Sequence, residues 1–158
     1  MTRYFDASAL VKRYVRETGS VMVRRLLASG IVATSRLSEV EVAAGIVRRA
    51  REGAFTPARR DRALAALERD IPAFAIVEVI PEVTTDARAL LLRHPLRASD
   101  AIQLASCLYL QRQLNQPISF VVFDQRLLDV ARAEGVAIVA VSSGRQSTLM
   151  RTSRTEAR

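Results

Sequence analysis

Three aspartates at the borders of expected strands and helices are the residues of this sequence best suited to chemistry. Asp6 follows the segment TRYF, Asp124 follows ISFVVF, and Asp100 lies in the run RASDAIQLA. Carboxylates gathered at one place repel one another unless a cation neutralises them. Their hard oxygen atoms favour Mg²⁺ or Mn²⁺, ions that activate water and stabilise charge during phosphodiester cleavage. The aspartates therefore predict metal-dependent hydrolysis of a phosphodiester.

A fourth acid is expected from the segment SRLSEVEVAAGIVRR, which has the apolar spacing of a helix. Glu39 and Glu41 flank Val40, so their side chains point in different directions and one alone can face an acidic crevice. Glu41 falls beside Ala44 and Gly45, whose small size permits close packing. Glu41 is therefore the favoured fourth acid.

Each aspartate also has a purely structural interpretation. Asp6 and Asp124 could cap the helices that follow them, since Asp is a common N-cap residue. Asp100 falls in the first turn of a helix, where the dipole favours a negative charge, and Ser99 beside it could serve as the cap. Taken singly, these roles explain each residue. A shared catalytic site is favoured by the acids taken together.

Other hydrolytic chemistries lack their residues. His94 is the sole histidine and Cys107 the sole cysteine, so neither paired-histidine catalysis nor a zinc cluster is available. The sequence has no GxxxxGK[ST] phosphate loop and no GxSxG nucleophile motif. A phosphatase of the Asp-x-Asp type is disfavoured, because Ser8 occupies the position of its second acid and Lys12 is the only lysine. The acids remain as the catalytic groups.

Strands and helices are expected to alternate along the chain. Short apolar segments predict strands at residues 2–6, 31–35, 74–80, 118–124 and 136–141. Helical spacing predicts helices at residues 7–15, 18–29, 35–52, 58–70, 81–94, 99–114 and 124–135. In the helix at 35–52 the spaced apolar residues are Leu37, Val40, Ala44 and Val47. This alternation predicts a three-layer α/β/α sandwich with a central, mainly parallel sheet, in which ligands bind beyond the carboxyl ends of the strands.

Charge and size indicate a single domain that attracts polyanions. The 158 residues carry a net charge of +8, and all of the 24 basic residues except Lys12 are arginines. Arginine forks suit phosphate oxygens, which predicts attraction to RNA or DNA, although a GC-rich coding sequence would produce the same arginine bias. We expect one nuclease domain at residues 1–141 and a basic, disordered tail at residues 142–158.

The expected location is the cytoplasm. A single cysteine cannot form an internal disulfide, which fits a reducing compartment. No apolar run reaches the roughly 18 residues that a membrane span needs, and the N-terminus lacks the pattern of a signal peptide. The sequence thus predicts a soluble protein without a membrane partner.

Four segments together resemble the PIN-domain nucleases, and specifically the VapC-type toxins of bacterial toxin–antitoxin pairs. They are YFDASALVKRY, SRLSEVEVAAGIVRR, RASDAIQLASCLYL and FVVFDQRLLDVARAEGV, and they span nearly the whole chain in the family's order. The resemblance implies a PIN-like fold in which Asp6 and Asp100 bind the metal, with Ser8 and Ser99 in support.

The resemblance also implies an activity and partners. Glu41, favoured over Glu39, and Asp124 would complete the catalytic acids of an endoribonuclease that uses Mg²⁺, with Mn²⁺ as a possible substitute. RNA would be the substrate, the protein would form a homodimer, and a cognate antitoxin would occupy the acidic crevice. One departure is Val122, which stands where the family often has Thr or Ser two residues before Asp124. The loss of that hydroxyl group would weaken support of a metal.

A catalytically inactive PIN-like module that binds RNA or a partner protein is the alternative. Its arginines would hold phosphates and its acids would act only as helix caps. In an active enzyme, Arg36 and Arg97 lie near the second and third segments and are expected to guide the RNA backbone, although ordinary solvated surface explains them as well. Neither the RNA that is cut nor the identity of the antitoxin follows from the sequence.

Overall fold

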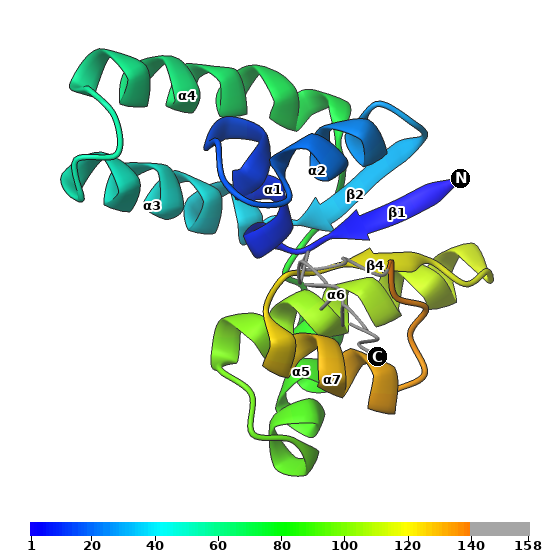
Figure 1. Ribbon diagram of the computed structural model, residues 1–158. Coiled ribbons are helices and arrows are strands. Elements are labelled where there is room, and N and C mark those ends of the chain that lie inside the picture. Colours follow the sequence, from blue (N-terminus) through cyan, green and yellow to red (C-terminus); the bar gives the residue numbers. More distant parts are fainter. Residues whose placement is uncertain (140–158) are drawn as a thin grey trace, which may run out of the picture.

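A parallel sheet forms the centre of the computed structural model, which describes residues 1–139. The strands are β1 (Thr2–Phe5), β2 (Ile31–Ser35), β3 (Ala75–Val77) and β4 (Ser119–Val121). They lie in the order β3-β2-β1-β4, so β1 pairs with β2 on one side and with β4 on the other. Because the strands are parallel, the residues that follow their carboxyl ends share one edge of the sheet (Figure 1).

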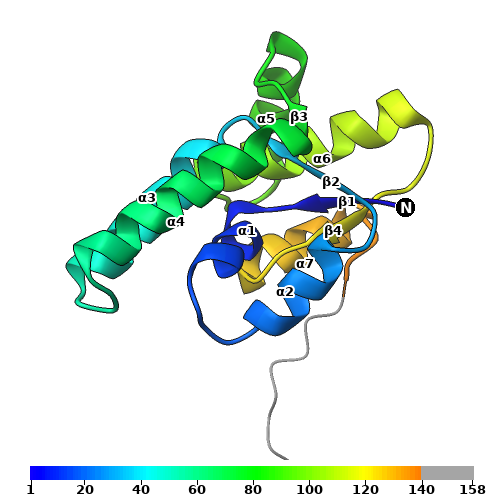
Figure 2. The ribbon, with the colours of Figure 1, turned by 90° about the horizontal axis from the view of Figure 1, so that it is seen from above.

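Helices cover both faces of this sheet. They are α1 (Ala7–Tyr14), α2 (Ser20–Leu27), α3 (Ser38–Arg51), α4 (Pro57–Asp70), α5 (Pro81–Arg93), α6 (Ala98–Leu114) and α7 (Gln125–Ala133), with a 3₁₀ turn, η1 (Ile71–Ala73), after α4. Figure 1 shows α1 to α4 on one side and α5 to α7 on the other. Figure 2, seen from above, shows α3 and α4 side by side and extending away from the sheet.

Alternate residues of the strands supply two separate cores, because successive side chains of a strand point to opposite faces. Tyr4, Ala33 and Phe120 are neighbours across three strands, and they pack with residues of α5, α6 and α7. Phe5 and Val121 turn to the other face and pack with residues of α1, α3 and α4. The expected three-layer α/β/α sandwich with a parallel sheet is therefore confirmed.

Some strands are shorter than their apolar segments. The segment at 118–124 pairs only to Val121, because the backbone N–H of Phe123 donates to the side chain of Ser8 instead of to a neighbouring strand. The strand expected at 136–141 makes one isolated bridge within the described residues, between Phe120 and Ile138, and its last two residues lie outside them. The expected tail at 142–158 also lies outside the described residues.

The apolar spacing that predicts α3 does not mark its buried face. The buried residues of α3 are Ser38, Val42, Gly45 and Ile46. By contrast, Val40 is 69% exposed. Gly45 lies so close to α1 that a Cβ atom there would stand 2.9 Å from Cγ2 of Val11. This close approach, which glycine permits, sets the rotation of α3 about its axis and turns Val40 outward.

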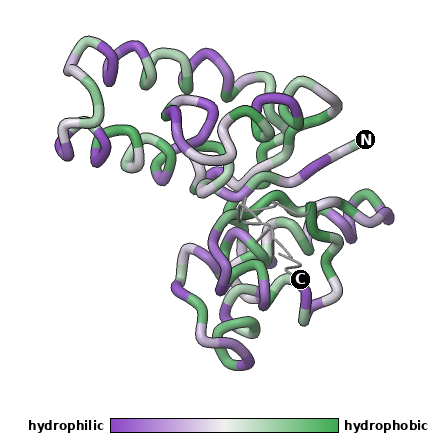
Figure 3. Tube along the Cα trace, in the orientation of Figure 1, coloured by the Kyte–Doolittle hydropathy of each residue, from purple (hydrophilic) through white to green (hydrophobic). Residues whose placement is uncertain are grey.

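Hydrophilic and hydrophobic positions alternate along α4, as Figure 3 shows. This is the pattern of a helix with one covered face, and Ala63 and Leu67 are its buried residues.

Within residues 1–139, no helix is both long and apolar enough to cross a membrane.

Candidate active site

Asp6 lies at the carboxyl end of β1, where the chain turns into α1. Its backbone N–H donates to the carbonyl oxygen of Val121 at 3.0 Å, which ties this turn to β4. Its Oδ2 accepts a hydrogen bond of 2.9 Å from the backbone N–H of Ser8, so the carboxylate also caps α1. Burial raises the pKa of Asp6 to about 6; the hydrogen bonds from Ser8 oppose this rise. The negative charges of Glu41 and Asp100 raise the pKa of Asp6 further.

Asp124 lies just beyond the carboxyl end of β4, the strand next to β1. Its Oδ1 accepts a hydrogen bond of 2.9 Å from the backbone N–H of Leu127 and caps α7. The preceding residue, Phe123, donates its backbone N–H to Oγ of Ser8 at 3.1 Å. Asp6 and Asp124 thus occupy two joined turns, and both carboxylates cap helices as the structural interpretation expects.

Glu41, rather than Glu39, is the glutamate whose charge acts on Asp6. Oε2 of Glu41 accepts a hydrogen bond of 2.7 Å from Nε2 of Gln103, and its charge acts on the pKa of Asp6. Glu39 forms an ion pair with Arg36 at the surface of the molecule. The structure therefore brings Glu41 from α3 and Asp6 from β1 into the same neighbourhood.

Asp100 lies half-buried in the first turn of α6. Burial raises its pKa, and the negative charge of Asp124 adds to the rise. The backbone N–H of Arg97 and the guanidinium charges of Arg97 and Arg126 act against it. Asp100 is thus coupled electrostatically to Asp124 on one side and to Asp6 on the other.

The expectation that Ser99 caps α6 is wrong. The helix begins at Ala98, so Ser99 is its second residue, and Arg97 is the N-cap without a side-chain hydrogen bond. A capping side chain must come from the residue before the helix, and Ser99 stands too far along the chain for that role.

A buried polar network behind Glu41 was not expected from the sequence. Gln103 is fully buried on α6 and donates from Nε2 to Glu41 and, at 2.9 Å, to Oγ of Ser38. Its Oε1 accepts a hydrogen bond of 2.9 Å from the hydroxyl of Tyr4. Oγ of Ser38 lies 2.7 Å from Oγ1 of Thr34. The one signal in the sequence is a glutamine inside the apolar run AIQLASCLYL.

A second unexpected cluster lies beneath the turn that carries Asp124. Nζ of Lys12 lies 2.6 Å from Oε1 of Glu17 and 4.3 Å from the ring centroid of Phe123. The other oxygen of Glu17 pairs with Arg49 at 2.5 Å. Burial acts to raise the pKa of Glu17, but hydrogen bonds and charges from Lys12 and Arg49 outweigh it and lower that pKa. The cluster joins α1 and α3 to the end of the β4 segment.

The two arginines expected near the crevice differ in their surroundings. Arg36 is held by two carboxylates, those of Glu39 and Glu78, and its Nη2 lies 2.5 Å from Oε1 of Glu78. Its guanidinium is therefore engaged within the protein. Arg97 is exposed and close enough to Asp100 to act on its pKa. The same holds for the exposed Arg126 at the start of α7, which no motif of the sequence marks.

The acidic side chains fit a hard divalent cation by their chemistry. Their donors are oxygens, and a cation would relieve the repulsion that raises the pKa of the buried Asp6. Within the described part of the chain, however, no three carboxylate, imidazole or thiol groups converge closely enough to form a ready-made ion site. The carboxylates are near enough to act on one another, but they do not surround a single point.

Val122, the departure from the family's pattern near Asp124, is fully buried in the core.

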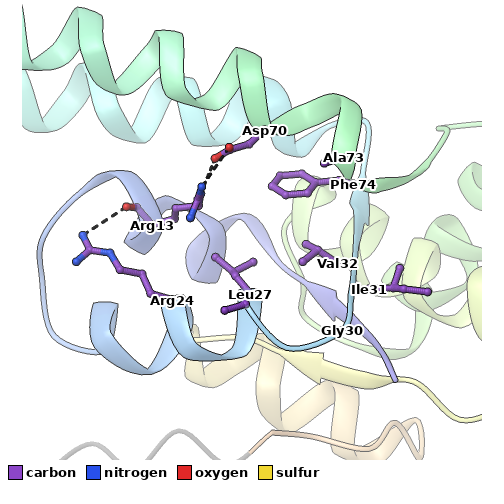
Figure 4. A pocket seen from close by; sticks show the side chains of 10 residues that line it. Arg13, Arg24, Leu27, Gly30, Ile31, Val32, Asp70, Ala73 and Phe74 are labelled. Carbon is purple, nitrogen blue, oxygen red and sulfur yellow. Dashed lines mark hydrogen bonds and ion pairs between the residues drawn. The ribbon is translucent and has the colours of Figure 1, made fainter.

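A separate hollow of about 490 Å³ lies away from these acids (Figure 4). Gly30, Ile31 and Val32 line it at the amino end of β2, the opposite end of the parallel sheet from Asp6. Arg13 lies in its wall and pairs with Asp70 at 2.5 Å. The hollow is therefore distinct from the acidic site.

Comparisons with known proteins agree with this arrangement. The PIN domain model matches residues 3–133. The chain is 36% identical over 141 residues to ribonuclease VapC45 of Mycobacterium tuberculosis (strain CDC 1551 / Oshkosh), covering 85% of this chain and 92% of that protein. Its fold is similar to that of VapC20 of Mycobacterium tuberculosis, described as a sarcin-ricin loop cleaving toxin, with a TM-score of 0.63 and 19% identity. The match covers 87% of this chain and 97% of the VapC20 chain. A toxin-antitoxin complex from Klebsiella pneumoniae gives a TM-score of 0.60 at 18% identity, with 87% and 96% coverage.

Proposed function

The chain belongs to the PIN domain family, in which its curated relatives are VapC ribonucleases, and we propose that it is a metal-dependent endoribonuclease acting as the toxin of a type II toxin–antitoxin pair. One observation carries the proposal. Asp6, Glu41 and Asp100 come from a strand and two different helices, yet the charges of Glu41 and Asp100 both act on the buried carboxylate of Asp6. Mutual repulsion of this kind persists in a fold when it serves a site.

The four acids have distinct places in the proposed mechanism. Asp6 and Asp100 would hold a Mg²⁺ or Mn²⁺ ion, and Glu41 and Asp124 would hold it directly or through water. The bound ion would supply an activated water molecule and offset charge on the phosphate under attack. Asp6 is oriented for this role by the backbone N–H of Ser8, which fixes one carboxylate oxygen.

Substrate binding is assigned to arginines beside Asp100. Arg97 and Arg126 are exposed, and their charges reach Asp100. Guanidinium groups bind phosphate oxygens in a bidentate manner, so these two would hold the RNA backbone next to the acids. Arg36 is not assigned this role, because Glu39 and Glu78 engage its guanidinium.

The proposed partners follow from the family. The fold is similar to that of a protein solved in a toxin-antitoxin complex, and we propose a cognate antitoxin that covers the acidic crevice of this chain. We also propose a homodimer. Size-exclusion chromatography with light scattering tests the dimer. Capture of a co-purifying protein from the source cells tests the antitoxin: a bound antitoxin should suppress RNA cleavage, and a freely active complex would contradict this proposal.

RNA cleavage by the purified protein tests the activity. Structured RNA is incubated with the protein in Mg²⁺, in Mn²⁺ and in EDTA, and the 5′-labelled products are separated on a denaturing gel. Cleavage is expected in either ion and not in EDTA. Asp6→Asn keeps the helix cap but removes the charge, so it should reduce cleavage about 100-fold or more.

Asp61→Asn is the matched control, because Asp61 is an exposed residue of α4 whose partner is Arg60. It should cleave like the unaltered protein. Cleavage that survives EDTA or Asp6→Asn would contradict the metal mechanism. RNA binding without cleavage in any ion would instead favour the inactive binding module.

A further inference from the structure

The buried network behind Glu41 has one possible direction of proton donation. Oγ1 of Thr34 donates to the carbonyl oxygen of Phe5 at 2.7 Å, which uses the single hydroxyl proton of Thr34. Oγ of Ser38 lies 2.7 Å from Oγ1 of Thr34. Because the proton of Thr34 is already used, Ser38 must donate its own hydroxyl proton to Thr34. Ser38 can then only accept from Gln103.

This order fixes the side-chain amide of Gln103. The atom that faces Ser38 must be the NH₂ group, because a carbonyl oxygen could not donate to it. The same NH₂ group reaches Oε2 of Glu41 at 2.7 Å, and an ionised carboxylate can only accept. The amide oxygen is left for the hydroxyl of Tyr4, which donates to it at 2.9 Å. Both N–H groups and the oxygen of Gln103 are thus paired.

Burial makes this network selective for a single arrangement. Gln103 and Tyr4 are fully buried, and Ser38 is 2% exposed. A buried amide or hydroxyl without a partner is costly, so an alternative rotamer of Gln103 is strongly disfavoured. Because β1, β2, α3 and α6 each contribute to the network, Glu41 is held relative to the strand that carries Asp6.

We propose that Gln103 is a positioning residue: its amide, oriented by Ser38 and Tyr4, holds the carboxylate of Glu41 in the orientation from which it would take part in ion binding and cleavage together with Asp6. The inference rests on the proposed function, since it assigns Gln103 a task within that site. Gln103 does not touch the substrate or the reacting atoms. It acts through Glu41.

Metal affinity measured apart from turnover tests this role. Mn²⁺ binding to the metal-free protein is titrated by electron paramagnetic resonance, and RNA cleavage is measured separately. Gln103→Met has a similar volume but no donor, and it should weaken Mn²⁺ binding by about 10- to 100-fold, the usual effect of removing a group that orients a metal ligand. The kcat should fall similarly while KM for RNA stays within about twofold.

Gln111→Met is the matched control. Gln111 lies on the same helix, and its Oε1 accepts a hydrogen bond of 3.0 Å from the backbone N–H of Ile118, so the substitution also removes one hydrogen bond. It should leave Mn²⁺ affinity and kcat unchanged. If Gln103→Met does not fold, as judged by its circular dichroism spectrum, Gln103→Leu, which also lacks a donor, replaces it and should show the same losses.

The outcomes separate the two proposals. If the unaltered protein binds Mn²⁺ in a manner that Asp6→Asn abolishes, but a folded Gln103 variant binds it equally well, the positioning role is overturned and the proposed function stands. If the unaltered protein neither binds Mn²⁺ nor cleaves RNA, both proposals fall. In the metal-free protein, nuclear magnetic resonance should find both Gln103 NH₂ protons displaced from the chemical shifts of exposed glutamine amides, with Glu41→Ala moving one signal and Ser38→Ala moving the other. Two signals at the exposed positions, which neither variant moves, would contradict the fixed amide.

Discussion

Ser8 and Phe123, 115 residues apart in sequence, are joined by a hydrogen bond of 3.1 Å in which the backbone N–H of Phe123 donates to Oγ of Ser8. The same Ser8 donates its own backbone N–H to Asp6, and Phe123 precedes Asp124. One serine therefore connects the turns that carry two of the candidate acids. The distance between these turns depends on a side chain and not on the pairing of β1 with β4 alone.

Ser8→Ala should lower both the stability of the fold and the rate of RNA cleavage. The substitution leaves the partly buried N–H of Phe123 without its acceptor, at a cost of about 1–2 kcal/mol in the free energy of unfolding. Because the turn of Asp124 is then free to shift, kcat for RNA should fall about 10-fold. Urea unfolding and single-turnover cleavage measure the two effects.

Ser20→Ala is the control for this prediction. Oγ of Ser20 accepts from the backbone N–H of Glu17 and donates to the carbonyl oxygen of Val15, so its loss also costs stability. It touches neither acidic turn and should leave kcat unchanged. Equal loss of kcat in both variants would mean that Ser8 acts only through stability.

Two substitutions of Asp124 should separate its capping role from its chemical role. Asp124→Asn keeps an oxygen for the N–H of Leu127, so the midpoint of thermal unfolding should stay within about 2 °C while cleavage is lost. Asp124→Ala loses the cap as well, and its free energy of unfolding should fall by about 1 kcal/mol. Should Asp124→Asn cleave RNA normally, capping would be the whole function of this residue.

The sequence predicted the acids that follow strands, and the reason is topological. Once the strands are known to be parallel, Asp6 and Asp124 must lie at the same edge of the sheet, whatever the side chains around them do. The alternation of strands and helices along the chain indicates that the strands are parallel, and each segment can be recognised from its own residues. This is why the layer architecture could also be predicted.

What could not be predicted depends on partners distant in sequence. Gln103 acquires its role from Tyr4 and Glu41, which lie 99 and 62 positions away. Arg36 is engaged by Glu78, which lies 42 positions away. Apart from the apolar run that surrounds Gln103, nothing in the immediate neighbourhood of these residues distinguishes them from ordinary polar residues.

Details of helix geometry also escaped prediction. Val40 has the right spacing for a buried face, but the close approach at Gly45 rotates α3 and exposes it. Ser99 has the right chemistry for a cap, but the helix starts one residue before it. Tertiary packing therefore decides the exposure of Val40. The place of Ser99 depends on where α6 begins, and sequence patterns locate helix boundaries poorly.

Two glycines with similar backbone angles should respond very differently to alanine. Gly19 has a φ of +90° and Gly53 a φ of +77°, so an L side chain is strained at both. A Cβ atom on Gly19 would overlap the ring of Phe123, whereas one on Gly53 would meet nothing within 4 Å. Gly19→Ala should therefore cost about 2–4 kcal/mol in unfolding free energy, against about 1 kcal/mol for Gly53→Ala.

The activity of these variants adds a second test. Displacing the ring of Phe123 moves the residue before Asp124, so Gly19→Ala should also reduce kcat at a temperature where the protein remains folded. Gly53→Ala should leave kcat unchanged. Equal destabilisation of the two variants in urea unfolding would show that the backbone angle, and not contact with Phe123, sets the cost.

Asp6 should destabilise the metal-free fold near neutral pH. Burial raises its pKa from 3.8 to about 6, so between these values the folded protein binds more protons at Asp6 than the unfolded chain does. The contribution of this group to stability is therefore full below about pH 4 and is lost as the pH rises to about 6. Above pH 6 the folded protein must hold an ionised, buried carboxylate that Glu41 and Asp100 repel.

Asp6→Asn removes that cost while keeping an N-cap residue at the start of α1. In EDTA at pH 7.5 it should raise the free energy of unfolding by about 1–3 kcal/mol, because one pKa unit corresponds to about 1.4 kcal/mol. At pH 4 the difference should nearly vanish, since Asp6 is then protonated in the folded protein. Urea unfolding at both pH values measures this, with Asp61→Asn as the exposed control. If Asp6→Asn instead has a lower free energy of unfolding than the unaltered protein at pH 7.5, the ionised carboxylate of Asp6 stabilises the fold. Repulsion among the acids would then not reduce stability.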